Sequence, residues 1–128
     1  MSPFEAMVAA ELRGLLRAGA TPRAVHLTVR ELVVEHIVHD PLGAREITAT
    51  VEATVRTACV LVSELGASAD LVDIVCGASI EAVRGHGGES ARWLAEAMNA
   101  ASAVLEEQAR ERGGEQAWRW LAGRVLQW

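Results

Sequence analysis

Residues 47–65 read ITATVEATVRTACVLVSEL, and this stretch decides the fold class. Its apolar side chains recur every three or four residues, at Ile47, Val51, Val55, Ala58, Val62 and Leu65. Because an α-helix turns once every 3.6 residues, this spacing places all of them on one face of a helix. Asp40-Pro41 combines a capping residue with a proline suited to the first helical turn, and Gly66 is a natural stop. We therefore expect an amphipathic helix that starts at Pro41 and ends before Gly66.

Similar start and stop signals divide the rest of the chain into further helices. Ser2 and Glu5 form a capping box around Pro3, Thr21-Pro22 repeats the cap-then-proline signal, and Ser68 can cap a later helix. The expected helices cover approximately 3–18, 22–39, 41–65, 69–84, 89–112 and 118–126. The sequence therefore predicts an all-α protein with five or six helices.

The segment 22–39 is apolar on more than one side. Val25, Leu27 and Val29 alternate with polar neighbours, so a short strand over 24–30 is an alternative to a helix. We prefer the helix because the apolar residues from 32 to 37 restore the helical period. One buried stripe does not need this much apolar surface, and the excess favours contact with another molecule.

Three segments share a pattern of one apolar residue, two further positions, Ala, and then Cys or Ser. They are Val55–Val62, Val75–Ala82 and Met98–Leu105. Small side chains let helix axes approach closely, because the distance between axes depends on the side chains at the contact. We expect these segments to form the tight centre of one helical bundle, with residues 1–128 as a single domain.

The charge balance excludes some partners. The chain has 128 residues, a net charge of -5 and 12 basic residues, all of which are Arg. Strong binding to nucleic acid without sequence preference needs clustered positive charge, and so does binding to an anionic membrane surface. We expect neither partner. The absence of Lys, together with abundant Ala, Val, Arg and Gly, indicates a bacterial protein from a GC-rich genome.

The two cysteines and the N-terminus point to a cytoplasmic protein. Cys59 and Cys76 both sit in apolar runs, where a free thiol behaves as a small hydrophobe, and we expect packed thiols rather than a disulfide. The first residues have no basic start and no long apolar stretch, so they do not resemble a signal peptide. Charged residues interrupt the apolar region 47–83, and no uncharged run approaches the ~20 residues needed to cross a bilayer.

Residues 58–77 resemble a helix-turn-helix element in their packing pattern, with a Leu-Gly turn, a Ser cap and apolar positions in the second helix. The side chains do not suit DNA. A recognition helix reads bases and phosphates with Arg, Lys, Asn or Gln, whereas this helix offers Asp70, Asp73 and Glu81. An ordinary helical hairpin is the preferred interpretation, and a DNA-binding regulator is a further alternative.

A cluster of histidine and acidic residues provides the metal hypothesis. His36 and His39 lie about 60° apart on a helix, and Glu35 lies beside them. His and Glu are suitable ligands for zinc, iron or manganese, so these three residues are the candidate metal ligands. The simpler interpretation is a core His36 bonded to a neighbouring helix and a solvated His39 near the helix end. We expect no cofactor under that interpretation, and a metal-binding bundle is the alternative function.

The tryptophans favour an interface. Trp118 belongs to an apolar stripe in the last helix, whereas Trp120 points away from that stripe and Trp128 ends the chain. Tryptophan is enriched at binding hot spots, so Trp120 and Trp128 are the candidate interface residues. No Ser/His/Asp or Cys/His catalytic arrangement can be argued from the sequence. We expect a non-enzymatic bacterial interaction or regulatory module that binds itself or another helical protein.

Overall fold

The computed structural model describes residues 2–39, 46–85 and 90–112, and within them the chain forms five helices and no strand. The helices are α1 (Pro3–Arg17), α2 (Pro22–His39), α4 (Ile47–Leu65), α5 (Asp70–Arg84) and α6 (Ser90–Arg112). The prediction of an all-α bundle is confirmed. Residues 24–30 lie inside α2, so the strand alternative is wrong. The helix expected over 118–126 lies outside the described residues.

The predicted helix ends are mostly confirmed, because local capping chemistry fixes them. The backbone N–H of Glu5 donates to Ser2 Oγ at 3.1 Å, and the N–H of Ala24 donates to Thr21 Oγ1 at 3.2 Å. Gly66 ends α4 with a φ of 63°, a left-handed conformation that favours glycine.

The predicted helix start at Pro41 lies outside the described residues. Within them α4 begins at Ile47, and Glu46 before it has φ -118° and ψ 48°, which are not helical values. The predicted continuous helix over 41–65 is therefore wrong, because Glu46 interrupts it.

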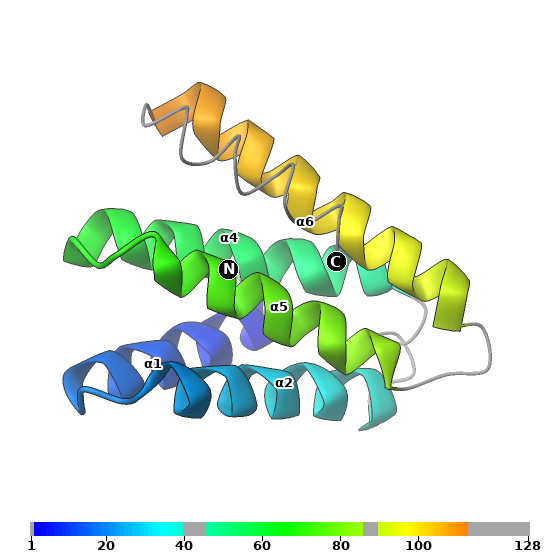
Figure 1. Cartoon of the computed structure of the whole chain (residues 1–128), viewed down its shortest axis with the longest axis horizontal. Coiled ribbons are helices and arrows are strands. Elements are labelled where there is room, and N and C mark those ends of the chain that lie inside the picture. Colours follow the sequence, from blue (N-terminus) through cyan, green and yellow to red (C-terminus); the bar gives the residue numbers. More distant parts are fainter. Residues whose placement is uncertain (1, 40–45, 86–89, 113–128) are drawn as a thin grey trace.

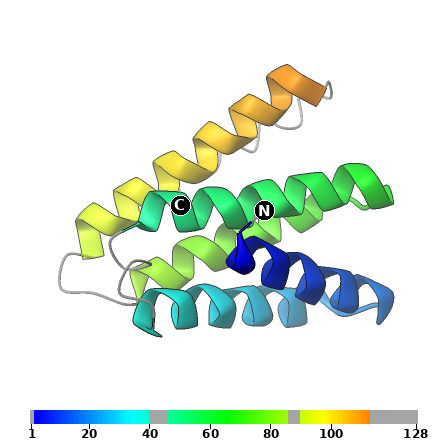
Figure 2. The ribbon, with the colours of Figure 1, turned by 180° about the vertical axis from the view of Figure 1, so that it is seen from behind.

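The helices form three layers (Figures 1 and 2). Helices α1 and α2 form one outer layer, α4 and α5 form the middle layer, and α6 covers the opposite side. Helix α5 contacts α2, α4 and α6, whereas α6 contacts only α4 and α5 among the described helices. Helices α4 and α5 run antiparallel as a hairpin (Figure 1). The middle layer therefore separates α6 from α1 and α2.

The hydrophobic core follows the stripe predicted for α4, with one exception. Ile47, Val51, Val55, Ala58 and Val62 are buried, but Leu65 is 54% exposed. Leu65 is the last residue of α4, next to the turn at Gly66, and the described helices leave it exposed. A stripe predicted from spacing alone does not show where the covering helix ends.

The three small-residue segments meet in the centre of the bundle, as predicted. Their paired small residues are all buried, on α4, α5 and α6 respectively: Ala58 and Cys59, Ala78 and Ser79, Ala101 and Ser102. These three helices contact one another. The buried hydroxyl of Ser79 donates to the carbonyl of Val75 at 2.9 Å, so its burial leaves no unpaired donor.

Both cysteines are buried and free, which confirms the prediction of packed thiols. Burial raises the pKa of the Cys76 thiol well above its ordinary value, and Cys59 and Asp73 raise it further. The thiol therefore stays protonated at neutral pH and is a poor nucleophile. None of the described helices is long and apolar enough to span a membrane.

Candidate functional site

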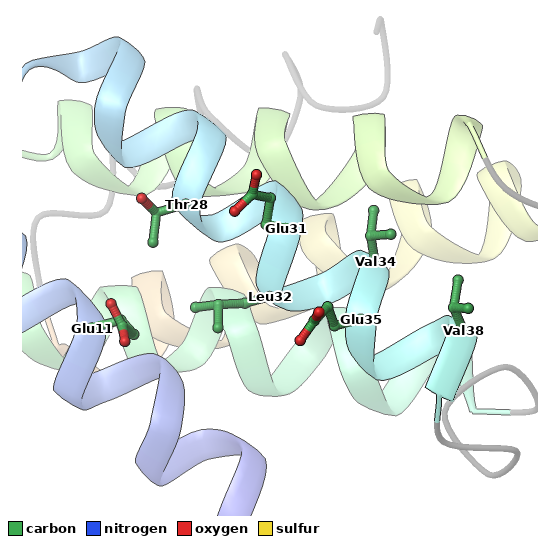
Figure 3. A pocket seen from close by; sticks show the side chains of 7 residues that line it. All are labelled: Glu11, Thr28, Glu31, Leu32, Val34, Glu35 and Val38. Atoms are coloured by element: carbon green, nitrogen blue, oxygen red, sulfur yellow. The ribbon is translucent and has the colours of Figure 1, made fainter.

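The three residues proposed as metal ligands all lie on α2, and the structure describes the side chains of two of them, Glu35 and His36. The His36 ring is half-buried and stacks on Phe4 of α1, with ring centroids 4.2 Å apart and an angle of 18° between the planes. Glu35 is exposed and lines a groove between α1 and α2 (Figure 3). His39 is the last residue of α2, and its side chain lies outside the described part of the chain.

Among the described residues, no group of three or more His, Cys, Asp or Glu side chains is arranged to hold a metal ion. The stacking on Phe4 gives His36 a contact with the neighbouring helix, although this contact is aromatic. The metal site remains a prediction that metal analysis of the purified protein would test.

The arrangement of α5 argues against insertion into a DNA groove. In residues 58–77, the second helix is the start of α5, which packs against α2, α4 and α6. A recognition helix needs a free face that can enter the major groove. Most of α5 is buried, and Glu81 on its exposed side bonds to α2. Residues 58–77 form an ordinary helical hairpin here.

An ion-pair cluster joins α2 to α5. The Glu81 carboxylate is in contact with His26 Nε2 through one oxygen, and the other oxygen accepts a hydrogen bond from Arg30 Nη1 at 3.3 Å. The hydrogen bond with His26 lowers the pKa of Glu81, and the charges of His26 and Arg30 lower it further. The sequence did not indicate this cluster, because 55 residues separate His26 from Glu81.

Helix α2 has two apolar sides. Val25, Val29, Val33 and Ile37 point into the core. Leu27, Glu31, Val34 and Val38 follow one another at helical spacing on the opposite side, and we call these four residues the outer ridge. Leu27 is 37% exposed and Val38 is 55% exposed. The sequence did signal this surface, because residues 22–39 are apolar on more than one side.

A groove with a volume of about 680 Å³ runs along the outer ridge on the side of α1. Figure 3 shows its lining, which we call the acidic groove: Glu11 from α1 and Thr28, Glu31, Leu32, Val34, Glu35 and Val38 from α2. The three carboxylates are exposed, and within the described residues no hydrogen bond or ion pair involves them. An apolar surface with an acidic edge suits an amphipathic helix that carries basic residues.

A second hollow of about 510 Å³ lies between α2 and α5. Its lining includes Arg30 and Arg84 as well as Glu31 and Glu81, so its charges are mixed. The two hollows lie on either side of the outer ridge and share Glu31 and Val34. The acidic groove therefore differs from its neighbour in net charge, because its lining is acidic whereas the charges of its neighbour balance.

The predicted interface residues Trp120 and Trp128 lie outside the described residues. Trp93 on α6 is partly buried against the core. Comparison with protein-family models, with curated proteins and with solved structures found no match for the chain.

Proposed function

We propose that this protein is a non-enzymatic helical interaction or regulatory module that self-associates through the outer ridge of α2. The observation that carries the proposal is the second apolar side of α2, where Leu27 and Val38 are exposed and Val34 is half-buried between them. Exposed apolar side chains that share one side of a helix can form a site of protein contact. A bacterial, cytoplasmic setting is part of the proposal and rests on composition.

The distribution of exposed apolar side chains supports this location. Four large hydrophobic side chains are exposed among the described residues, and three of them, Met7, Leu27 and Val38, belong to α1 and α2. The fourth, Leu65, lies at the end of α4. Three of the four large exposed hydrophobic side chains of the described residues therefore lie in the outer layer formed by α1 and α2.

The acidic groove supplies the charged edge of this surface. Charged residues around an apolar contact determine its orientation and exclude wrong partners more than they add affinity. Glu11, Glu31 and Glu35 therefore select a partner surface with positive charge. This chain carries its positive charge entirely on Arg, which pairs with carboxylates through two parallel hydrogen bonds.

Val38→Glu in the full chain tests the proposal, with Leu65→Glu as the matched control. The two parent side chains are 55% and 54% exposed, so neither substitution disturbs the core. We expect light scattering of the wild type to give a mass above the 13.7 kDa of one chain, increasing with concentration. Val38→Glu should lower this mass and Leu65→Glu should not. A wild type that remains monomeric at high micromolar concentration, or two variants with equal mass, would contradict the proposal.

A further inference from the structure

The acidic groove has a candidate occupant within the same sequence. Residues 113–128 read GGEQAWRWLAGRVLQW and follow directly after α6. At about 100° per residue on a helix, Trp118, Leu121 and Val125 share one face. Arg119, Trp120 and Arg124 fall on the rest of the helix surface. On this second face Arg124 lies about 40° from Trp120, and Arg119 lies about 100° from Trp120 on its other side, so a positive charge flanks the tryptophan on each side.

We propose that this second face of residues 113–128 docks in the acidic groove of another copy of the chain. The proposal rests on the proposed function and names the partner of the same surface. Trp120 packs on the apolar part of the groove formed by Leu32, Val34 and Val38. Arg119 and Arg124 pair with the groove carboxylates.

Charge complementarity favours this groove over the neighbouring hollow. The acidic groove presents three carboxylates and no basic residue. The hollow between α2 and α5 balances Arg30 and Arg84 with Glu31 and Glu81, so it presents no excess of negative charge. Arg forms strong paired hydrogen bonds with carboxylates, and a central Trp commonly contributes most to such an interface. The described residues give Glu11, Glu31 and Glu35 no internal cation to displace.

The layer order indicates that the groove belongs to a different copy. Helix α6 lies on the opposite side of the middle layer from α1 and α2 (Figure 2). Residues 113–128 follow α6 directly, so they begin on the side of the middle layer away from the groove. This position favours the groove of another copy over that of the same chain.

When the segment of one copy binds the acidic groove of the next, the two contact surfaces differ and the copies assemble head to tail. Such contacts form a ring if the rotation between copies closes, and an open chain if it does not. In an open chain, one end copy keeps a free segment and the other end copy keeps a free groove, so further copies can bind at both ends. The mass should therefore increase steadily with concentration and pass beyond that of a dimer, unless a ring closes.

A charge swap in the full chain tests this inference. The segment variant is Arg119→Glu with Arg124→Glu, and the groove variant is Glu31→Arg with Glu35→Arg. Alone, each variant places like charges on both surfaces and should remain monomeric in light scattering. Mixed in equal amounts, each segment meets a groove of opposite charge, so assembly should return. Circular dichroism of each variant checks that the helices are retained.

The outcomes separate this inference from the proposed function. If the groove variant loses assembly and the segment variant keeps it, another surface occupies the groove. That result overturns the inference and leaves the proposed function intact. If neither variant changes the mass, both are overturned. Failure of the mixture to assemble, with both variants folded and monomeric, also overturns the inference.

Trp120→Ala provides a second measurement. Truncation of a central interface tryptophan typically weakens association by about thirtyfold or more. We expect a smaller mass than that of the wild type at the same concentration, with helix content and unfolding midpoint retained in dilute solution. A lower unfolding midpoint with unchanged mass would show that Trp120 is buried within one chain, and would overturn the inference.

Discussion

Helices α5 and α2 are both rich in apolar side chains, but the bundle surrounds α5 and leaves one side of α2 open. Nine of the 15 residues of α5 are buried, because α2, α4 and α6 all pack against it. Among the described side chains of α2, the buried ones are Val25, Val29, Val33 and Ile37. The apolar residues of α5 therefore serve folding, whereas those on the outer ridge of α2 are available for contact with another molecule.

The difference lies in position within the layers more than in composition. Helix α5 contributes small residues such as Ala78 and Ser79, which allow close approach of neighbouring helices. Helix α2 lies in an outer layer, where one apolar stripe is sufficient for folding. Leu27 and Val38 lie on its exposed side, outside the buried stripe.

Ile80→Ala should produce the largest loss of stability. Ile80 is a large, fully buried side chain of α5, and its truncation leaves a cavity in the central layer. Such substitutions cost about 2–5 kcal/mol of unfolding free energy. Urea unfolding followed by circular dichroism measures the change. A loss below about 1 kcal/mol would mean that α5 is not the packed centre of the bundle.

Ala101→Leu should have the next largest effect, with Ala103→Leu as its control on the same helix. Ala101 is buried among the small residues where α6 meets the middle layer, whereas Ala103 is exposed. Overpacking a close helix contact costs about 1–3 kcal/mol, and a surface change usually stays within about 0.5 kcal/mol. Equal unfolding free energies for the two variants would contradict the tight centre predicted from the sequence.

The sequence predicted the helices well because helix signals are local. Ser2 and Thr21 cap the helices that follow them, and the positive φ of Gly66 ends α4 as its position suggested. The small-residue pattern also predicted a shared centre. The predicted continuous helix over 41–65 was wrong, because Glu46 is not helical and α4 begins at Ile47.

The order of the helix layers could not be predicted from the sequence. Periodicity identifies the apolar side of a helix but not the helix that covers it. Arg56, for example, bonds at 3.2 Å to Glu107 of α6, which is 51 residues away. The acidic groove depends equally on the pairing of α1 with α2, because Glu11 belongs to one helix and Glu35 to the other. Only the apolar excess of 22–39 indicated this surface in advance.

Glu81→Gln should have a smaller effect, and one that depends on pH, because it weakens the link between α5 and α2. The folded protein holds the pKa of Glu81 below its ordinary value, so the ionised form stabilises the fold above that value. This contribution is lost as the pH falls below about 4.3 toward the lowered pKa. Because Glu81 is exposed, we expect less than about 1 kcal/mol.

Thermal unfolding at pH 5.5 and at pH 3 measures this contribution. The wild type should be more stable than Glu81→Gln at pH 5.5, and the difference should shrink at pH 3. High salt should also reduce the difference at pH 5.5, because salt screens exposed charges. A difference that is equal at both pH values would show that the contacts of Glu81 with His26 and Arg30 do not stabilise the fold.

Val38→Ser should have the smallest effect on the single chain and so tests the open side of α2 most directly. Val38 is 55% exposed, and Ser and Val have similar helix propensities, so the expected change in dilute solution is below about 0.5 kcal/mol. Val33→Ser, at a buried position of the same helix, should lower the unfolding free energy several times more.

A series of protein concentrations extends the comparison to assembly, because association of folded chains stabilises them by mass action. The melting temperature of the wild type should rise with protein concentration, and that of Val38→Ser should rise less. A parallel rise for both proteins would place the contact between copies on a surface other than the outer ridge.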